Sequence, residues 1–170
     1  MKRILAFAPL AVLVVLAIVF AAYSLKRDPH VESMALVGKP TPDLTLPALA
    51  DGEPVKLRVA AKGPVLINVF ASWCPPCVAE SPALNQLKAA GVPIVGLAYK
   101  DEADKTRAFL VDNGNPFTTV LQADASAGLE LGVAGPPETF AVNAQGVIVG
   151  KHSGALSVAD AQDLMRKASR

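Results

Sequence analysis

The chain has 170 residues, of which 52% are hydrophobic and 18% are charged, and its net charge is +1. The balanced charge excludes the basic footprint of a nucleic-acid-binding protein, and the apolar content excludes a disordered chain. Two cysteines are too few for a disulfide-rich scaffold or a four-cysteine zinc site.

The first segment of the chain is an almost entirely apolar run from Ile4 to Leu25. It exceeds the ~7–15 apolar residues of a signal peptide and reaches the ~20 residues of a spanning helix. We therefore expect a signal-anchor over residues 1–27, with cleavage near Ala21 or Ala22 as the alternative. The sequence contains no second run of this length, which excludes a polytopic membrane protein.

Basic residues flank the apolar run on both sides. Lys2 and Arg3 favour an N-terminus inside the cytoplasm, whereas Lys26 and Arg27 weaken that preference. With the N-terminus inside, the rest of the chain lies outside the cytoplasm, where a cysteine pair can cycle or stay oxidised. The polar residues 28–37 are expected to form a tether.

Residues 38–170 carry the pattern of one α/β domain. Alternating or β-branched apolar runs predict strands at residues 44–46, 55–57, 64–70, 93–98, 139–142 and 147–151. Caps and breakers predict helices at residues 75–90, from 101 or 104 to about 113, at 126–131, and at 158–168 with Ser157 as its cap. The first two strands flank Asp51-Gly52 and suggest a hairpin. A mixed sheet with helices on both faces is the natural packing.

The segment that carries chemistry is Trp73-Cys74-Pro75-Pro76-Cys77, between a predicted buried strand and a predicted helix. Two cysteines with this spacing can close a small disulfide. Cys74 would lie at the helix N-terminus, where unpaired N–H groups and the dipole stabilise a thiolate that attacks disulfides. Cys77, one turn onward, would resolve the mixed disulfide. The segment predicts a redox-active Cys74–Cys77 disulfide that needs no cofactor.

The two prolines between the cysteines affect the thiolate. Pro75 suits the first helical position, where no N–H partner is needed. Pro75 and Pro76 together remove two N–H groups near the sulfur, and the Cys77 N–H remains. A less stabilised thiolate makes the dithiol a better reductant.

Two other interpretations of the cysteines are weaker. A purely structural disulfide across so short a loop gains little chain entropy. A two-sulfur metal site needs further ligands, and the sequence offers only His30 and His152 as histidines. We expect both histidines to be surface or packing residues, and we predict no metal site.

These features resemble the thioredoxin superfamily. Pro82 lies eight residues after Cys74, where thioredoxins carry a helix-kinking proline, and Pro137 lies in a Gly-Pro-Pro-Glu-Thr-Phe segment that resembles the family's cis-proline segment. Among subfamilies, the chain is similar to the membrane-tethered cytochrome c maturation thioredoxins, the CcmG/DsbE family. The stretches that carry this similarity are residues 36–40, 68–80, 96–101 and 131–140.

The resemblance implies a thioredoxin-like domain with an N-terminal β-hairpin extension and one transmembrane helix. The function implied is a periplasmic thiol:disulfide reductant, held by a single pass in the bacterial inner membrane. Electrons would come from a membrane thiol transporter of the DsbD or CcdA type. They would pass to the cysteine pair of apocytochrome c, or to the maturation partner CcmH, by Cys74 attack and Cys77 resolution.

The resemblance also implies a set of substrate-binding or redox-tuning residues. They are Trp73, Pro75, Pro76, Glu80, Pro136, Pro137, Glu138 and Thr139. Pro136 has no N–H, so a bound peptide loses one donor there. Negative charge from Glu80 and Glu138 near the redox pair would raise the pKa of Cys74. Asn68 stands where many thioredoxins carry a buried aspartate, so proton transfer would use Glu80 or water.

Other functions remain open on sequence grounds. The nearest is a general extracytoplasmic thioredoxin-like reductase of the TlpA or ResA type. A Sco-like copper chaperone is disfavoured because Sco proteins place three residues between their cysteines. A peroxidase is disfavoured because its threonine-rich cysteine motif is absent from the sequence. The Cys-x-x-Cys motif alone is also compatible with a disulfide-forming oxidant.

Overall fold

The computed structural model describes residues 12–16, 19–20 and 34–170. The chain divides into two units, Met1–Val31 and Glu32–Arg170. The described residues of the first unit are helical. Among all the described residues, no helix is both long enough and apolar enough to cross a membrane. Most of the predicted signal-anchor and tether lies outside the described residues.

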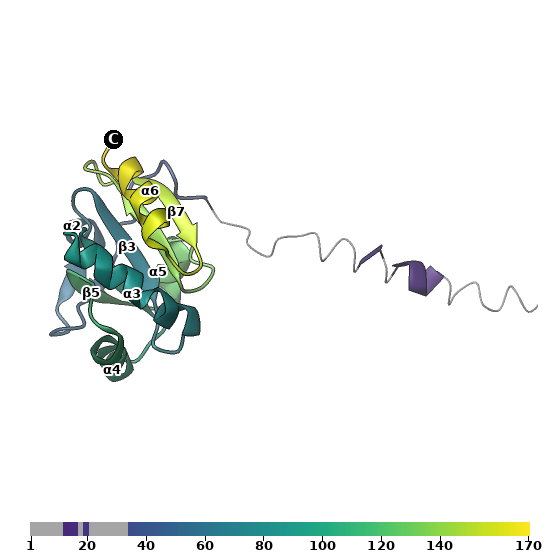
Figure 1. Cartoon of the computed structure of the whole chain (residues 1–170), viewed down its shortest axis with the longest axis horizontal. Coiled ribbons are helices and arrows are strands. Elements are labelled where there is room, and N and C mark those ends of the chain that lie inside the picture. Colours follow the sequence, from purple (N-terminus) through teal and green to yellow (C-terminus); the bar gives the residue numbers. More distant parts are fainter. Residues whose placement is uncertain (1–11, 17–18, 21–33) are drawn as a thin grey trace, which may run out of the picture. The chain divides into compact units, whose positions relative to one another are not determined.

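The second unit is built on a five-stranded sheet in the order β5-β4-β3-β6-β7 (Figure 1). The central strand β3 (Val65–Phe70) pairs in parallel with β4 (Ile94–Tyr99) and antiparallel with β6 (Glu138–Val142). At the edges, β5 (Thr119–Ala123) is parallel to β4, and β7 (Ile148–Ser153) is antiparallel to β6. The predicted mixed sheet is confirmed.

Strand β3 lies in the middle of the sheet, with helices over one face and the hairpin over the other, and every one of its residues is buried. Side chains alternate between the faces of a strand, so Leu66 and Phe70 enter one core layer, while Ile67 enters the other. Asn68 is a polar side chain in this run, and it is fully buried. Its alternation places it on the same face as Leu66 and Phe70.

The face of the sheet that carries Leu66 is covered by α3 (Pro75–Ala89), α4 (Ala103–Asn113) and α6 (Val158–Ala168). The helical side chains in this layer include Leu84, Leu87, Phe109, Leu110, Ala161 and Leu164. Helix α6 begins as predicted, because the Ser157 side chain accepts from the Asp160 N–H in a reciprocal capping box.

The opposite face is covered by the hairpin of β1 (Thr45–Pro47) and β2 (Pro54–Lys56), and by the short helices α2 (Leu57–Ala60) and α5 (Ala125–Glu130). The predicted hairpin is confirmed. The buried side chains of these elements and of the turns that follow them include Leu46, Leu57, Ala61, Ala127 and Leu131.

Three local predictions need correction. The predicted order lacked β5, although Thr118-Thr119-Val120 is a β-branched run typical of a strand. Leu57 begins α2 instead of ending a strand. Its N–H still donates to the Leu44 carbonyl of the hairpin, but its carbonyl accepts from the Ala61 N–H at 2.8 Å, which is a helical bond. The N-cap of α4 is Glu102 and not Asp101 or Asp104, and it makes no side-chain capping bond.

Candidate redox site at the start of helix α3

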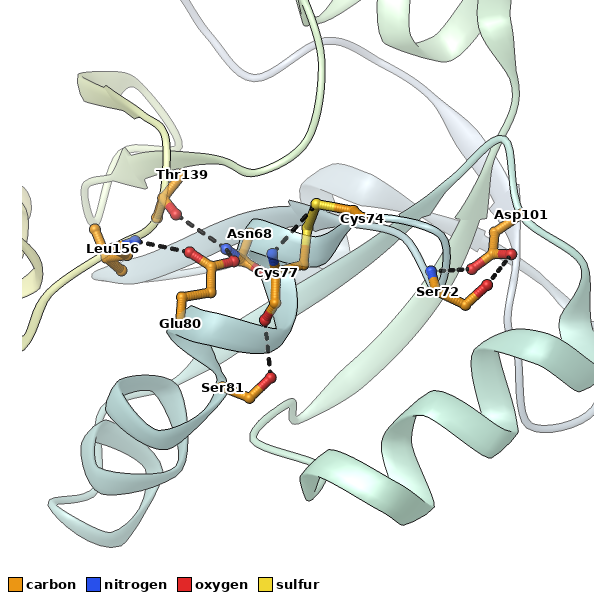
Figure 2. Close-up of a disulfide and its surroundings, with 9 residues drawn as sticks. All are labelled: Asn68, Ser72, Cys74, Cys77, Glu80, Ser81, Asp101, Thr139 and Leu156. Atoms are coloured by element: carbon orange, nitrogen blue, oxygen red, sulfur yellow. Dashed lines mark hydrogen bonds between the residues drawn. A yellow bond between two sulfur atoms is a disulfide. The ribbon is translucent and has the colours of Figure 1, made fainter.

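The cysteine pair lies where β3 gives way to α3, and its sulfurs are bonded as a Cys74–Cys77 disulfide (Figure 2). Cys74 is the N-cap of α3, with an extended backbone, and Cys77 lies in the first turn. Both are buried, with exposed fractions of 3% and 1%. The loop into the site turns at Ala71, whose carbonyl accepts from the Cys74 N–H at 3.2 Å.

The N–H groups around the Cys74 sulfur match the sequence expectation. Pro75 and Pro76 occupy the first two helical positions and have no N–H to offer. The Cys77 N–H donates to Cys74 Sγ at 3.3 Å and to the Cys74 carbonyl at 3.1 Å. The sulfur therefore lies at the positive end of the helix, with one shared backbone N–H as its donor.

The protein surface next to the buried disulfide carries exposed apolar side chains. Trp73 is 55% exposed and Val78 is 45% exposed, and both intervening prolines are exposed. The Trp73 indole Nε1 donates to the Lys100 carbonyl at 3.1 Å, and this hydrogen bond holds the nitrogen-bearing edge of the ring in place. This surface can contact a polypeptide that presents a disulfide.

Glu80 lies one helical turn beyond Cys77, and it is buried, not solvated as an ordinary helix glutamate would be. Its Oε1 accepts from Asn68 Nδ2 at 3.1 Å, and its Oε2 accepts from the Leu156 N–H at 2.8 Å (Figure 2). Burial raises the pKa of Glu80 from 4.5 to about 7, against the lowering effect of these two hydrogen bonds.

This raised pKa changes what Glu80 can do. A glutamate with an ordinary pKa would be a fixed negative charge at neutral pH. With a pKa near 7, Glu80 exchanges its proton at neutral pH, as a general acid or base must. Asn68 cannot take a proton, so its amide instead holds Glu80 in place.

The predicted proline marker is confirmed, since the Pro136–Pro137 bond is cis. Pro136 is half-buried and Pro137 is buried, with the Pro137 carbonyl accepting from the Gly154 N–H at 2.9 Å. Thr139 lies opposite Asn68 in the β3–β6 register, and its hydroxyl accepts from Asn68 Nδ2 at 3.1 Å. Thr139 therefore belongs to the same buried polar group as Glu80.

Glu138 is also buried, but it is not an isolated negative charge. Its Oε2 lies 2.9 Å from Lys151 Nζ, and the two side chains are 3% and 1% exposed. Its Oε1 accepts from the Ala134 N–H at 3.1 Å, and Lys151 donates to the Gly132 carbonyl at 3.1 Å. The charge that the sequence assigned to Glu138 is thus balanced by Lys151, and the pair ties the loop before Pro136 to the sheet.

Sequence reasoning did not identify Lys151 or Leu156 as part of the site. Lys151 follows the apolar residues Ile148 and Val149 in β7, and this position was an available signal, because a lysine that is buried is usually paired. The Leu156 N–H carries no signal in the sequence, since any residue other than proline could supply it. The contact depends only on where the loop between β7 and α6 passes.

The histidines do not join the redox pair in any metal-binding cluster that the structure describes. His152 lies in β7 opposite Thr139, and His30 lies outside the described residues. Within residues 34–170 and the short described helical stretches, no group of three or more His, Cys, Asp or Glu side chains could hold a metal ion.

Comparison with known proteins places this site in a family. The Redoxin family profile matches residues 36–165. The thiol:disulfide interchange protein DsbE of Vibrio cholerae is 45% identical over 161 residues, which cover 90% of this chain and 86% of that protein. DsbE of Pasteurella multocida is 41% identical over 155 residues, covering 88% and 86%.

Solved structures agree with the sequence relatives. A secreted Mycobacterium tuberculosis disulfide oxidoreductase homologous to Escherichia coli DsbE superimposes with a TM-score of 0.62 at 26% identity, covering 73% of this chain and 95% of that one. The fold is therefore thioredoxin-like, with a mixed sheet and flanking helices. The chain is a thiol-disulfide oxidoreductase that belongs to the CcmG/DsbE family.

Proposed function

We propose that this oxidoreductase is a periplasmic reductant for cytochrome c maturation, which reduces the cysteine pair of apocytochrome c or of the maturation partner CcmH. The observation that carries the direction of transfer is the single N–H at the Cys74 sulfur. Backbone N–H groups stabilise a thiolate, so two prolines at the first helical positions leave the reduced form less stabilised. A dithiol that is less stabilised gives up its electrons more readily.

The transfer proceeds in two exchanges between sulfurs. The Cys74 thiolate attacks one sulfur of the substrate disulfide, forming a mixed disulfide and releasing one substrate thiolate, which takes up a proton. Cys77 then loses its proton and attacks Cys74 Sγ. The second substrate sulfur leaves as a thiolate and takes up a proton, and the Cys74–Cys77 disulfide of the structure is restored. Two electrons pass from the protein dithiol to the substrate.

Glu80 is the proposed proton acceptor for Cys77. Its pKa of about 7 lets it bind and release a proton at neutral pH. It lies one turn from Cys77 on the same helix, and the Asn68 amide and the Leu156 N–H hold its two oxygens. Trp73, Pro136 and Thr139 keep the substrate-binding or tuning roles that the resemblance implies.

The tethered state and the electron donor belong to the same proposal. The apolar run at residues 4–25 would anchor the chain in the bacterial inner membrane as a single-pass protein. The domain from residue 38 onward would then face the periplasm. Regeneration of the dithiol needs a donor of two electrons, for which we propose a membrane thiol transporter of the DsbD or CcdA type.

The direction of transfer is tested by the reduction potential of the Cys74–Cys77 pair, measured by equilibration with graded thiol buffers. A potential of about −200 mV or lower is expected for a reductant, against about −120 mV for a strong oxidant. A potential near the oxidant value would overturn the proposed direction and would make disulfide formation the activity.

The substrate class is tested in cells from which the chromosomal gene for this protein has been deleted. Full-length chain should restore haem-stained c-type cytochromes, Cys74→Ser should not, and the exposed Ser126→Ala change should behave as the native chain. Added small dithiols should rescue Cys74→Ser, because they supply the same electrons. Normal c-type cytochromes in Cys74→Ser would refute the role, and a broad thiol defect would favour a general reductase of the TlpA or ResA type.

A further inference from the structure

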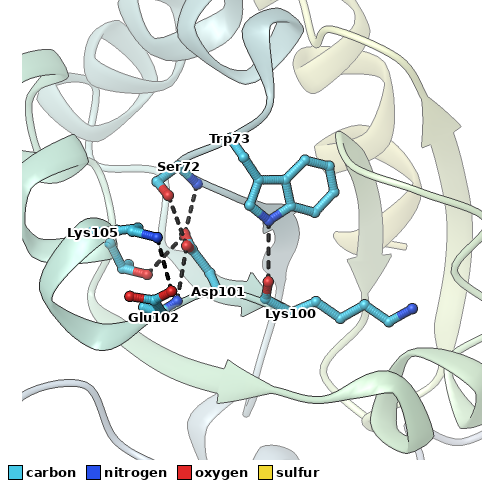
Figure 3. A network of polar contacts seen from close by, with 7 residues as sticks. Ser72, Trp73, Lys100, Asp101, Glu102 and Lys105 are labelled. Atoms are coloured by element: carbon cyan, nitrogen blue, oxygen red, sulfur yellow. Dashed lines mark hydrogen bonds and ion pairs between the residues drawn. The ribbon is translucent and has the colours of Figure 1, made fainter.

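A second polar cluster lies on the other side of the cysteine pair from Glu80, at the ends of two neighbouring strands. Strands β3 and β4 run in parallel, so the loop that follows β3 and the corner that follows β4 meet at one edge of the sheet. The first leads to Cys74, and the second holds Lys100 and Asp101 (Figure 3).

The carboxylate of Asp101 is the centre of this cluster. On one side it accepts from the Ser72 N–H at 2.6 Å and from Ser72 Oγ at 2.7 Å. On the other side it accepts from the Glu102 N–H at 2.9 Å and from Thr106 Oγ1 at 3.0 Å. One side chain therefore joins the loop before Cys74 to the start of α4.

The backbone of the corner is shaped for these contacts. Lys100 has a φ of 48°, which lies in the left-handed region that residues other than glycine rarely adopt. Next to Asp101, this residue directs its carbonyl to the Trp73 indole at 3.1 Å. The two residues that precede Cys74 are thus held at three points, two on Ser72 and one on Trp73.

We infer that Asp101 is a positioning residue for the Cys74 thiolate. In the oxidised protein, the covalent bond to Cys77 fixes the Cys74 sulfur. After reduction that bond is gone, and the sulfur is placed by its own backbone, which Asp101 holds through Ser72. The contact that this positioning preserves is the hydrogen bond from the Cys77 N–H to Cys74 Sγ. Neither intervening proline has an N–H that could replace it.

The sign of a pKa change separates this role from simple charge effects. Removing a negative charge near Cys74 lowers the pKa of its thiol, because the thiolate is then repelled less. Losing the ordered Cys77 N–H raises that pKa. Lys100 in the same corner, Glu80 on α3 and the surface pair of Glu102 and Lys105 also carry charge in this region. The variants below leave all four unchanged.

The test uses the reduced full-length protein and the rate at which iodoacetamide alkylates Cys74 across a range of pH. Asp101→Asn and Ser72→Ala should both raise the apparent pKa of Cys74. At a pH below the pKa, the fraction of Cys74 present as thiolate should be about fivefold smaller than in the native chain. A change of this size is expected from the loss of one hydrogen bond. The double variant should add little to Asp101→Asn alone, because the Ser72 hydroxyl acts only through its contact with the Asp101 carboxylate.

Two control variants separate positioning from charge and from stability. Asp104→Asn removes the same charge from an exposed site on α4, where the side chain is 97% exposed and forms an ion pair with Arg107. Thr41→Val removes a buried hydroxyl that donates to the Gly146 carbonyl and touches neither Asp101 nor the loop before Cys74. The first should leave the Cys74 profile unchanged, and the second should lower stability without moving that profile.

Fluorescence of Trp73, the single tryptophan, provides an independent readout. Its anisotropy should fall in reduced Asp101→Asn, because the loop that carries it is released. An unchanged or lowered Cys74 pKa in folded Asp101→Asn would overturn the inference, and Ser72→Ala decides the matter in the same way if Asp101→Asn does not fold. The reagent is a small molecule, so neither result depends on the proposed role in cytochrome c maturation.

Discussion

Replacing Glu80 with glutamine should remove a pH dependence from the stability of the fold. The pKa of Glu80 is about 7 in the folded protein and 4.5 as the ordinary value. The folded protein therefore binds more protons than the unfolded chain between these values, and its stability falls as pH rises through that window. At ~1.4 kcal/mol per pH unit, ionised Glu80 costs the fold on the order of 3 kcal/mol above pH 7.

The structure has room for glutamine at this position without losing both hydrogen bonds. The glutamine oxygen can accept from the Leu156 N–H, as Glu80 Oε2 does. Its amide then faces Asn68, whose buried Oδ1 has no hydrogen-bond partner among the described residues. A rotation of the Asn68 amide would let that oxygen accept from the new side chain. The variant should therefore fold.

The assay is chemical denaturation of the oxidised protein at pH 5, 6, 7 and 8. The difference in unfolding free energy between Glu80→Gln and the native chain isolates this one group from other carboxyls. That difference should shift by about 2.5 kcal/mol in favour of the variant between pH 5 and pH 8, because the unfolded carboxyl is already largely ionised at pH 5. Glu130→Gln, at an exposed site, should show no such shift. If the unfolding free energies of Glu80→Gln and the native chain change in parallel with pH, Glu80 does not titrate near neutral pH in the folded protein.

Three further changes test other parts of the site and fold. Lys151→Met should destabilise the protein by about 3–5 kcal/mol, because it leaves the Glu138 carboxylate buried without its ion pair; adding Glu138→Gln should restore most of the loss in thermal denaturation. Ser157→Ala removes the N-cap of α6 and should cost about 1 kcal/mol by denaturant midpoint. Pro75→His restores an N–H and should raise the reduction potential by at least ~30 mV, equal to ~1.4 kcal/mol, whereas an unchanged potential would contradict the proline argument.

Much of the fold could be predicted because its signals are local. The β-branched run of β3, the Ser157 cap of α6 and the turn of the N-terminal hairpin each depend on a few adjacent residues. The start of α4 could not be predicted in this way. Asp101 has the side chain of a good N-cap, but its carboxylate is taken by Ser72, which lies 29 residues earlier.

The redox site also combines features that adjacent residues determine with features that depend on contacts between distant residues. The sequence by itself determined the Cys-Pro-Pro-Cys segment at the start of a helix and the Pro137 segment, because both are short and specific. Only the tertiary structure decided the electrostatics around them. Glu80 meets Leu156 across 76 residues, and Glu138 meets Lys151 from the neighbouring strand β7. A pKa depends on burial and on partners, and the packing of distant segments sets both.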